Sequence, residues 1–166
     1  GVLRESGIYA KGKRNSTFTE YYQDGVTPRK ETPMQQGKID GTVKTYFRNG
    51  KIEAEKEYKQ SVESGRERRF DSKTGEQIFE SHYIDGKKDG EEWEIFEDAS
   101  TLRSRIIRHY RNGKLDGSYR VESTRDGKPY ITIEGQYTDG EKSGQWIEHN
   151  YGNNTQTCTW HGEGGA

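Results

Sequence analysis

The chain has 166 residues, of which 33% are charged and only 27% hydrophobic, and its formal net charge at neutral pH is -1. This length suits one domain, and so few apolar residues exclude a large hydrophobic core. The balanced charge gives no electrostatic footprint for nucleic acid, and no apolar run approaches the roughly 18 residues that span a bilayer. We therefore expect no nucleic-acid partner, whereas association with a membrane surface is left open.

The first segment, residues 1–8, shows no structural pattern, and we expect it to be a lead-in to the folded part. It contains no apolar segment of the kind found in signal peptides, and it opens on Gly in place of Met, which suggests a processed N-terminus. The single cysteine, Cys158, excludes an internal disulfide. These features leave the cellular compartment undecided.

An eight-residue phrase recurs along the chain from residue 9 onward. It reads YIDGKKDG at 83–90, YRNGKLDG at 110–117 and YTDGEKSG at 137–144, and weaker copies stand at 9–16, 34–41 and 58–65. A second set of turn signals lies between the copies. Asn-Gly and Asp-Gly are strong hairpin signals, because a type I′ turn needs positive φ at both central residues. We expect these glycines to form the structural turns of the repeat: Gly12, Gly25, Gly37, Gly50, Gly75, Gly86, Gly113, Gly127 and Gly140.

The segments between these turns predict strands. TVKTYF at 42–47, EEWEIF at 91–96 and YITIEGQY at 130–137 mix β-branched and aromatic residues with polar ones. Tight turns join neighbouring antiparallel strands, so the sequence predicts an all-β repeat protein, an elongated antiparallel β-meander of about twelve strands in roughly six hairpin repeats of about 25 residues. We expect one repeat domain over 9–160 and a flexible C-terminal tail over 161–166.

Aromatic residues occupy most of the positions three residues before a turn, as at Tyr83 and Tyr110. A ring can cover the bare backbone of a neighbouring glycine, so we expect these rings to line a half-buried face. One hairpin, centred on Ala99 and Ser100, predicts a register in which Trp93 lies opposite Ile106. A slip of one residue would reverse the face of every side chain.

The phrase Y-x-[DN]-G-K-x-x-G-x-[WY] resembles the MORN-repeat variant of bacterial toxin–antitoxin and immunity proteins. The clearest copies cover 83–93, 110–119 and 137–146, and weaker copies extend the resemblance over about 9–160. The copy at 58–65 lacks the first glycine, and the copy at 9–16 lacks the second. The resemblance implies a bacterial protein of the periplasm, cell envelope or cytoplasm that binds a partner toxin and neutralises it by stoichiometric occlusion.

The residues that usually carry chemistry form no catalytic or metal-binding pattern. Cys158 and His161 make a single C-x-x-H, which lacks the second pair of ligands that a zinc site needs. Asp85 and Asp89 are separated by lysines and do not match a calcium loop. We therefore expect a protein that is not an enzyme, with no metal and no cofactor.

Candidate contact residues come from the aromatic positions of the motif and from the basic stretch 103–111, because Trp, Tyr and Arg dominate binding hot spots. We select Trp93, Arg103, Arg105, Arg108, Arg111, Tyr119 and Trp146 as protein-binding anchors. Two other functions stay open, since an architecture does not fix a function. They are a structural or membrane-associated scaffold and a carbohydrate- or cell-wall-binding repeat module. The oligomeric state is not fixed by the sequence.

Overall fold

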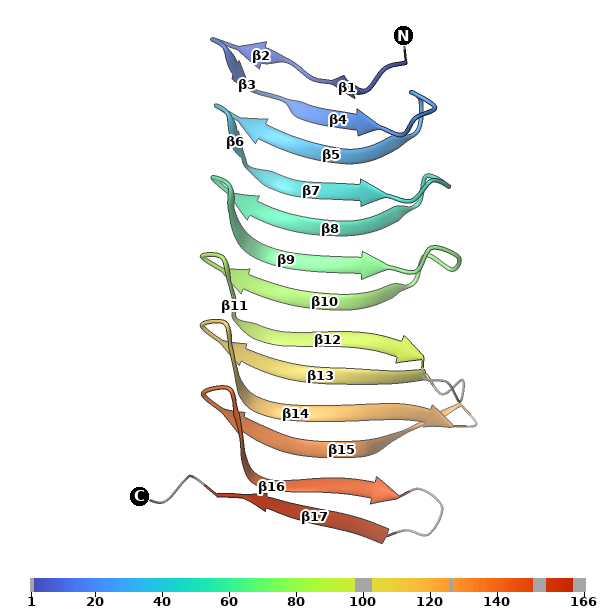
Figure 1. The fold of residues 1–166 in the computed structure, drawn as a ribbon, viewed down its shortest axis with the longest axis vertical. Coiled ribbons are helices and arrows are strands. Elements are labelled where there is room, and N and C mark those ends of the chain that lie inside the picture. Colours follow the sequence, from blue (N-terminus) through green and yellow to red (C-terminus); the bar gives the residue numbers. More distant parts are fainter. Residues whose placement is uncertain (1, 98–102, 126, 151–154, 163–166) are drawn as a thin grey trace. The chain divides into compact units, whose positions relative to one another are not determined.

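The computed structural model describes residues 2–97, 103–125, 127–150 and 155–162, and these contain strands and turns but no helix (Figure 1). The described part of the chain accordingly offers no helix that could cross a membrane. The chain divides into two compact units, residues 1–87 (unit 1) and 88–166 (unit 2). Each unit is described by itself.

Unit 1 is an antiparallel meander whose longer strands follow one another in chain order. Its sheet order is β1-β4-β5-β7-β8-β9-β10, while β2 pairs with β3 and β6 with β5. The strands are β1 (Glu5–Ser6), β2 (Tyr9–Ala10), β3 (Lys13–Arg14), β4 (Thr17–Tyr21), β5 (Pro28–Gln35), β6 (Lys38–Ile39), β7 (Gly41–Tyr46), β8 (Ile52–Lys59), β9 (Val62–Phe70) and β10 (Gln77–Ile84).

Unit 2 has the same construction, with sheet order β12-β13-β14-β15-β16-β17. Its strands are β12 (Gly90–Glu97), β13 (Arg103–Arg111), β14 (Lys114–Arg125), β15 (Lys128–Thr138), β16 (Glu141–Asn150) and β17 (Thr155–His161), and the short β11 (Lys87–Lys88) contains the boundary between the units. Twelve strands among the described residues have five residues or more, so the predicted all-β antiparallel meander is confirmed. The predicted domain limits stay a prediction; β1 lies within the expected lead-in.

The turns of the repeated phrase have positive φ at both central residues. The angles are 49° and 79° at Asp85 and Gly86, and 51° and 85° at Asn112 and Gly113. This is the backbone of a type I′ turn, which matches the twist of the strands on either side. All nine glycines selected as turns have positive φ: Gly12, Gly25, Gly37, Gly50, Gly75, Gly86, Gly113, Gly127 and Gly140.

Each turn of this kind is hydrogen-bonded to the repeat before it. The N–H of Gly86 donates to the carbonyl of Glu63 at 2.9 Å, and the N–H of Gly113 donates to the carbonyl of Lys88 at 2.7 Å. The same bond recurs from Gly37 to Arg14, from Ser61 to Ile39 and from Gly140 to Leu115. The aspartate of the phrase adds a second link, since Asp89 Oδ2 accepts the N–H of Asn112 at 3.0 Å. The phrase therefore recurs because it specifies both a turn and its attachment.

Side chains alternate between two faces of each unit, and one face carries the repeat tyrosines. Tyr83 lies directly opposite Gly65 in unit 1, and Tyr110 lies opposite Gly90 in unit 2. Tyr58 and Tyr137 likewise lie opposite Gly41 and Gly117. These four glycines have φ between 102° and 120°, so the half-buried rings stand beside backbone that has no side chain of its own. We call this face of each unit the tyrosine face and the other the reverse face.

The small core lies mainly on the tyrosine face. The buried apolar side chains among the described residues are Phe18, Val43, Phe79, Ile107, Val121 and Trp146. By strand register, all of them except Ile107 point to the tyrosine face. Apolar side chains on the reverse face, other than Ile107, are therefore not part of this core.

Candidate binding surfaces on the two sheet faces

The predicted register of the β12–β13 hairpin was wrong by one residue. Trp93 lies opposite Ile107, not Ile106. The register follows the pairing of Gly90 with Tyr110 at the far end of the strands, whereas the predicted turn at Ala99 and Ser100 lies outside the described residues. Because side chains alternate, this shift places Trp93 on the reverse face.

The seven predicted anchors consequently do not form one patch. Trp93 and Arg105 lie together on the reverse face, with the guanidinium carbon 4.5 Å from the ring centroid. Arg103 and Arg111 occupy the same side of β13, and Arg111 pairs with Asp116 at 3.3 Å. Arg108, Tyr119 and Trp146 lie on the tyrosine face.

Two of these tyrosine-face anchors belong to an aromatic cluster of unit 2. The rings of Tyr119, Tyr137 and Trp146 contact one another, with centroid separations of 5.2 to 5.7 Å. Trp146 is only 6% exposed and covers Gly135, where an added Cβ would come within 2.3 Å of its ring. Its indole N–H donates to the carbonyl of Gln136 at 3.2 Å. Tyr119 and Trp146 thus stabilise the sheet, and the buried Trp146 presents little free contact area whereas Tyr119 is half-buried.

Arg108 is held by a buried acid. Glu92 occupies the position two residues after a repeat glycine, where Tyr119 and Trp146 stand in later repeats, and it is 1% exposed. Its carboxylate pairs with Lys88 and lies 3.3 Å from Nε of Arg108. Burial, together with the charge of Glu92, raises the pKa of Tyr110. This network satisfies a carboxylate that water cannot reach.

The reverse face of unit 1 carries a row of alternating charges, which we call the charge ladder. Glu55 lies between two cations, with Lys44 Nζ at 3.6 Å and an Arg68 guanidinium nitrogen at 3.1 Å. The full row of directly opposed residues is Ser6, Thr19, Glu31, Lys44, Glu55, Arg68 and Glu80. Each charge in this ladder faces an opposite charge on a neighbouring strand.

The corresponding row on the reverse face of unit 2 is different, and we call it the mixed row. It consists of Trp93, Ile107, Arg120, Glu134, Ile147 and Cys158. Four of these six side chains are apolar or weakly polar, and only the central Arg120 and Glu134 repeat the opposed charges of unit 1. Trp160 lies opposite Gln145 on the same face and is 74% exposed.

A hollow of about 450 Å³ lies over the middle of the mixed row. Ile107 and Ile147 contribute its apolar lining, and Arg120, Glu134 and His109 are among its polar groups. Hydrogen bonds fix two of these, since Glu134 accepts from His149 at 3.0 Å and His109 Nδ1 lies 3.0 Å from the hydroxyl of Ser118. Such a recess, lined by both apolar and polar groups, can receive one protruding side chain of a partner.

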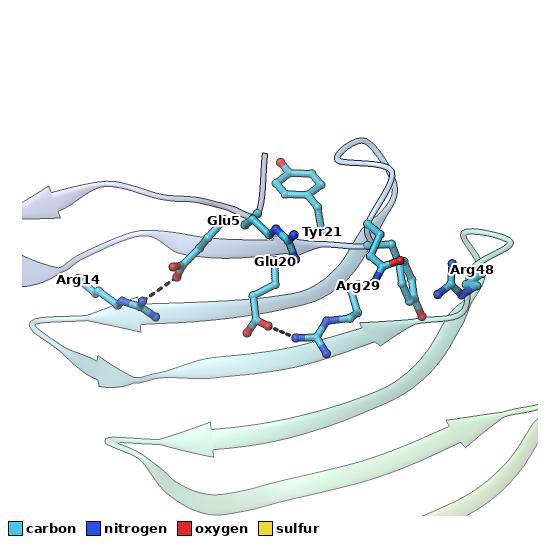
Figure 2. Close-up of a pocket in the computed structure, with 9 residues that line it drawn as sticks. Glu5, Arg14, Glu20, Tyr21, Arg29 and Arg48 are labelled. Atoms are coloured by element: carbon cyan, nitrogen blue, oxygen red, sulfur yellow. Dashed lines mark hydrogen bonds and ion pairs between the residues drawn. The ribbon is translucent and has the colours of Figure 1, made fainter. Parts of the chain in front are cut away.

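A second hollow, of about 630 Å³, lies in unit 1 and is lined by arginines (Figure 2). Glu5 and Glu20 stand directly opposite each other on β1 and β4. Arg14 pairs with Glu5 at 2.7 Å and Arg29 pairs with Glu20, as the dashed lines in Figure 2 show. The lining residues are Arg4, Glu5, Arg14, Glu20, Tyr21, Tyr22, Gln23, Arg29 and Arg48. We call this site the arginine hollow.

The described residues contain no group of three or more His, Cys, Asp or Glu side chains that could hold a metal ion. Cys158 is exposed at the end of the mixed row. The expectation of a protein without cofactor or catalytic residues stays a prediction.

A comparison with known protein families found no matching family model, and a comparison with curated proteins found no significant match. The resemblance to MORN-repeat proteins therefore rests on the repeated motif alone and stays a prediction.

Sequence reasoning missed both the mixed row and the arginine hollow. The mixed row could have been found by aligning the residue three positions after each second glycine, which gives Lys44 and Arg68 in unit 1 but Trp93 and Ile147 in unit 2. The arginine hollow has no such signal, because its four arginines come from four separate segments.

Proposed function

We propose that this chain is a non-catalytic protein-binding repeat protein that neutralises a bacterial toxin by stoichiometric occlusion. Its contact surface is the reverse face of unit 2. One observation supports this surface: most of the repeat positions that are charge-paired in unit 1 are apolar or aromatic in the mixed row of unit 2, where only Arg120 and Glu134 remain charged.

The two rows differ in what they offer a partner. Paired charges satisfy one another and lose hydration on binding, so they contribute little net affinity. Apolar and aromatic groups gain when water leaves them, by roughly 25 cal/mol per Å². Trp160, with 74% of its surface exposed, and Trp93, with Arg105 against its ring, are residues of the kind that dominate hot spots.

The toxin assignment is supported by the resemblance of the repeated phrase to antitoxin and immunity proteins. A repeat sheet suits that task, because its surface positions vary independently while the glycines and tyrosines keep the backbone constant. Occlusion requires no chemistry from this chain, only a stable one-to-one complex.

An affinity pull-down from lysate of the source organism, read by mass spectrometry, tests this function. We expect one stoichiometric partner that is toxic when expressed alone and harmless when co-expressed with this chain. Absence of any protein partner, with retention on membranes or cell-wall material, would contradict the proposal and favour a scaffold or wall-binding role.

A matched pair of variants tests the surface. The double variant Ile147→Ser/Trp160→Ser removes apolar groups from the reverse face of unit 2, and we expect it to weaken partner binding by at least about tenfold, or 1.4 kcal/mol. The control Lys44→Ser/Arg68→Ser alters the charge ladder of unit 1 and should leave binding unchanged. Circular dichroism of both variants verifies the fold. Equal losses in the two variants would contradict the assigned surface.

A further inference from the structure

The arginine hollow of unit 1 holds more positive charge than its own carboxylates balance. Four arginines and two glutamates line it, which leaves two positive charges in excess. Glu5 and Glu20 lie directly opposite each other, an arrangement that is unfavourable without cations. Arg14 and Arg29 supply those cations, so two of the four arginines have a structural explanation.

The other two arginines, Arg4 and Arg48, do not balance a carboxylate of the hollow. Within the described ranges, no carboxylate lies at ion-pair distance from either guanidinium. The nearby Asp24 is engaged in its own turn, where its Oδ1 accepts the N–H groups of Val26 and Thr27 at 2.9 Å. The charge of Arg48 helps to lower the pKa of Asp24, after the hydrogen bonds of that turn, but neither arginine is closed into an ion pair with a described residue, so both can pair with a ligand.

The position of Arg48 is set before any ligand arrives. Its guanidinium lies 5.0 Å from the ring centroid of Tyr22, and the hydroxyl of Tyr22 donates to the carbonyl of Tyr46 at 2.5 Å. A guanidinium stacked on a ring keeps its edge free, and that edge carries the donors that bind a carboxylate in bidentate fashion. Figure 2 shows Arg48 at one side of the hollow and the Glu5–Arg14 pair at the other.

We propose that the arginine hollow binds an acidic peptide segment whose carboxylates pair with Arg4 and Arg48. Two features favour an extended acidic segment over a single small anion. The hollow measures about 630 Å³, far more than one small anion fills, and its four arginines come from separate segments. A peptide with several carboxylates can pair with several guanidinium groups at once, whereas one phosphate ion offers a single compact charge. This site lies wholly in unit 1 and does not depend on the function proposed above.

Fluorescence anisotropy of a fluorescein-labelled octaglutamate peptide tests the proposal on the full chain. We expect saturable binding that weakens strongly between low salt and roughly 0.5 M NaCl, because exposed charges are screened at that ionic strength. The double variant Arg4→Gln/Arg48→Gln should weaken binding by about tenfold or more. Neither residue has an ion-pair partner to lose, and Arg48→Gln gives up only the contact with the Tyr22 ring, so circular dichroism should show the same fold.

Two controls distinguish a built site from general attraction. Arg66→Gln removes an exposed arginine of unit 1 that does not line the hollow, and it should leave the affinity unchanged. Glu20→Gln removes a competing carboxylate from the hollow and should tighten binding. An unchanged affinity in Arg4→Gln/Arg48→Gln would overturn the proposal. So would displacement of the peptide by inorganic phosphate at equal concentration, which would indicate a small-anion site.

Discussion

The two units share one backbone plan but use different side-chain chemistry on it. In unit 1 the reverse face is a charge ladder, and on the tyrosine face Lys56 pairs with Glu63 at 2.7 Å and Glu67 at 3.1 Å. In unit 2 the reverse face holds the mixed row, and the position of Glu67, two residues after a repeat glycine, holds Tyr119 and Trp146 of the aromatic cluster. Turn glycines and opposed tyrosines therefore suffice to define the sheet. The remaining positions are free to hold charge pairs or apolar groups, according to what each face must meet.

The largest expected effect concerns Glu92, the buried acid of unit 2. It is charged at a position where the later repeats of this unit have aromatic side chains. Glu92→Ala leaves Lys88 and Arg108 without their shared carboxylate, and we expect a loss of about 3 kcal/mol in the free energy of unfolding. Tryptophan fluorescence in urea measures it, because all three tryptophans lie in unit 2. The exposed Glu97→Ala is the control. A loss no larger than the control would show that unit 2 does not depend on this charge network.

The next prediction compares the mixed row of unit 2 with the charge ladder of unit 1. Ile107 is 7% exposed, so Ile107→Ala removes buried methyl groups and should cost about 2 kcal/mol. Its counterpart in the charge ladder is Glu55→Ala, for which we expect less than about 1 kcal/mol because Lys44 and Arg68 remain partly in water. Urea unfolding followed by circular dichroism covers both variants. Similar losses would remove the energetic distinction between the rows.

Acid should weaken unit 1 through its charge pairs. Burial of Glu67 favours its neutral form, but the Lys56 ammonium and the hydrogen bonds from Arg69 and Tyr83 together hold the pKa of Glu67 below its ordinary 4.5. A lowered folded-state pKa contributes stability above the unfolded value, and this stability is lost as pH falls below it. We expect Glu67→Gln to flatten the decline in stability between about pH 6 and pH 3. An unchanged slope would mean that the Lys56–Glu67 pair does not contribute to acid sensitivity.

The smallest effect is the salt dependence of the ladder itself. Arg68→Gln removes one partly exposed ion pair and should cost about 0.5 kcal/mol at low ionic strength, and less in roughly 1 M NaCl. Ile147→Val, a conservative change in the mixed row, should show no salt dependence. The pair of denaturation curves at two salt concentrations measures the difference. A salt-insensitive loss at Arg68 would point to packing of its aliphatic stem as the cause.

The strands and turns could be predicted because each depends on local chemistry. Asp85-Gly86 and Asn112-Gly113 specify their turns without help from distant residues. The register of β12 and β13 could not be predicted in the same way. It follows a pairing at the far end of the strands, Gly90 with Tyr110, and the other end has Ala99 where the remaining repeats have glycine.

The candidate sites were harder to predict, because the strand register must be known before each side chain can be assigned to a face of the sheet. Trp93 follows its glycine by three residues and Trp146 follows its glycine by two, and this single-residue difference decides which face each side chain takes. Arg48 and Arg4 are ordinary surface arginines in sequence. Only the pairing of strands brings their segments around one hollow.

The bond from each turn N–H to the carbonyl of the preceding repeat has an evolutionary consequence. Donor and acceptor are always 22 to 25 residues apart, and the acceptor is a backbone atom that every residue type supplies. A gene that duplicates or deletes one complete repeat therefore creates the same bond at the new junction, whatever the side chains are. Such a molecule can change its length in whole steps while single substitutions between the turns alter what it recognises.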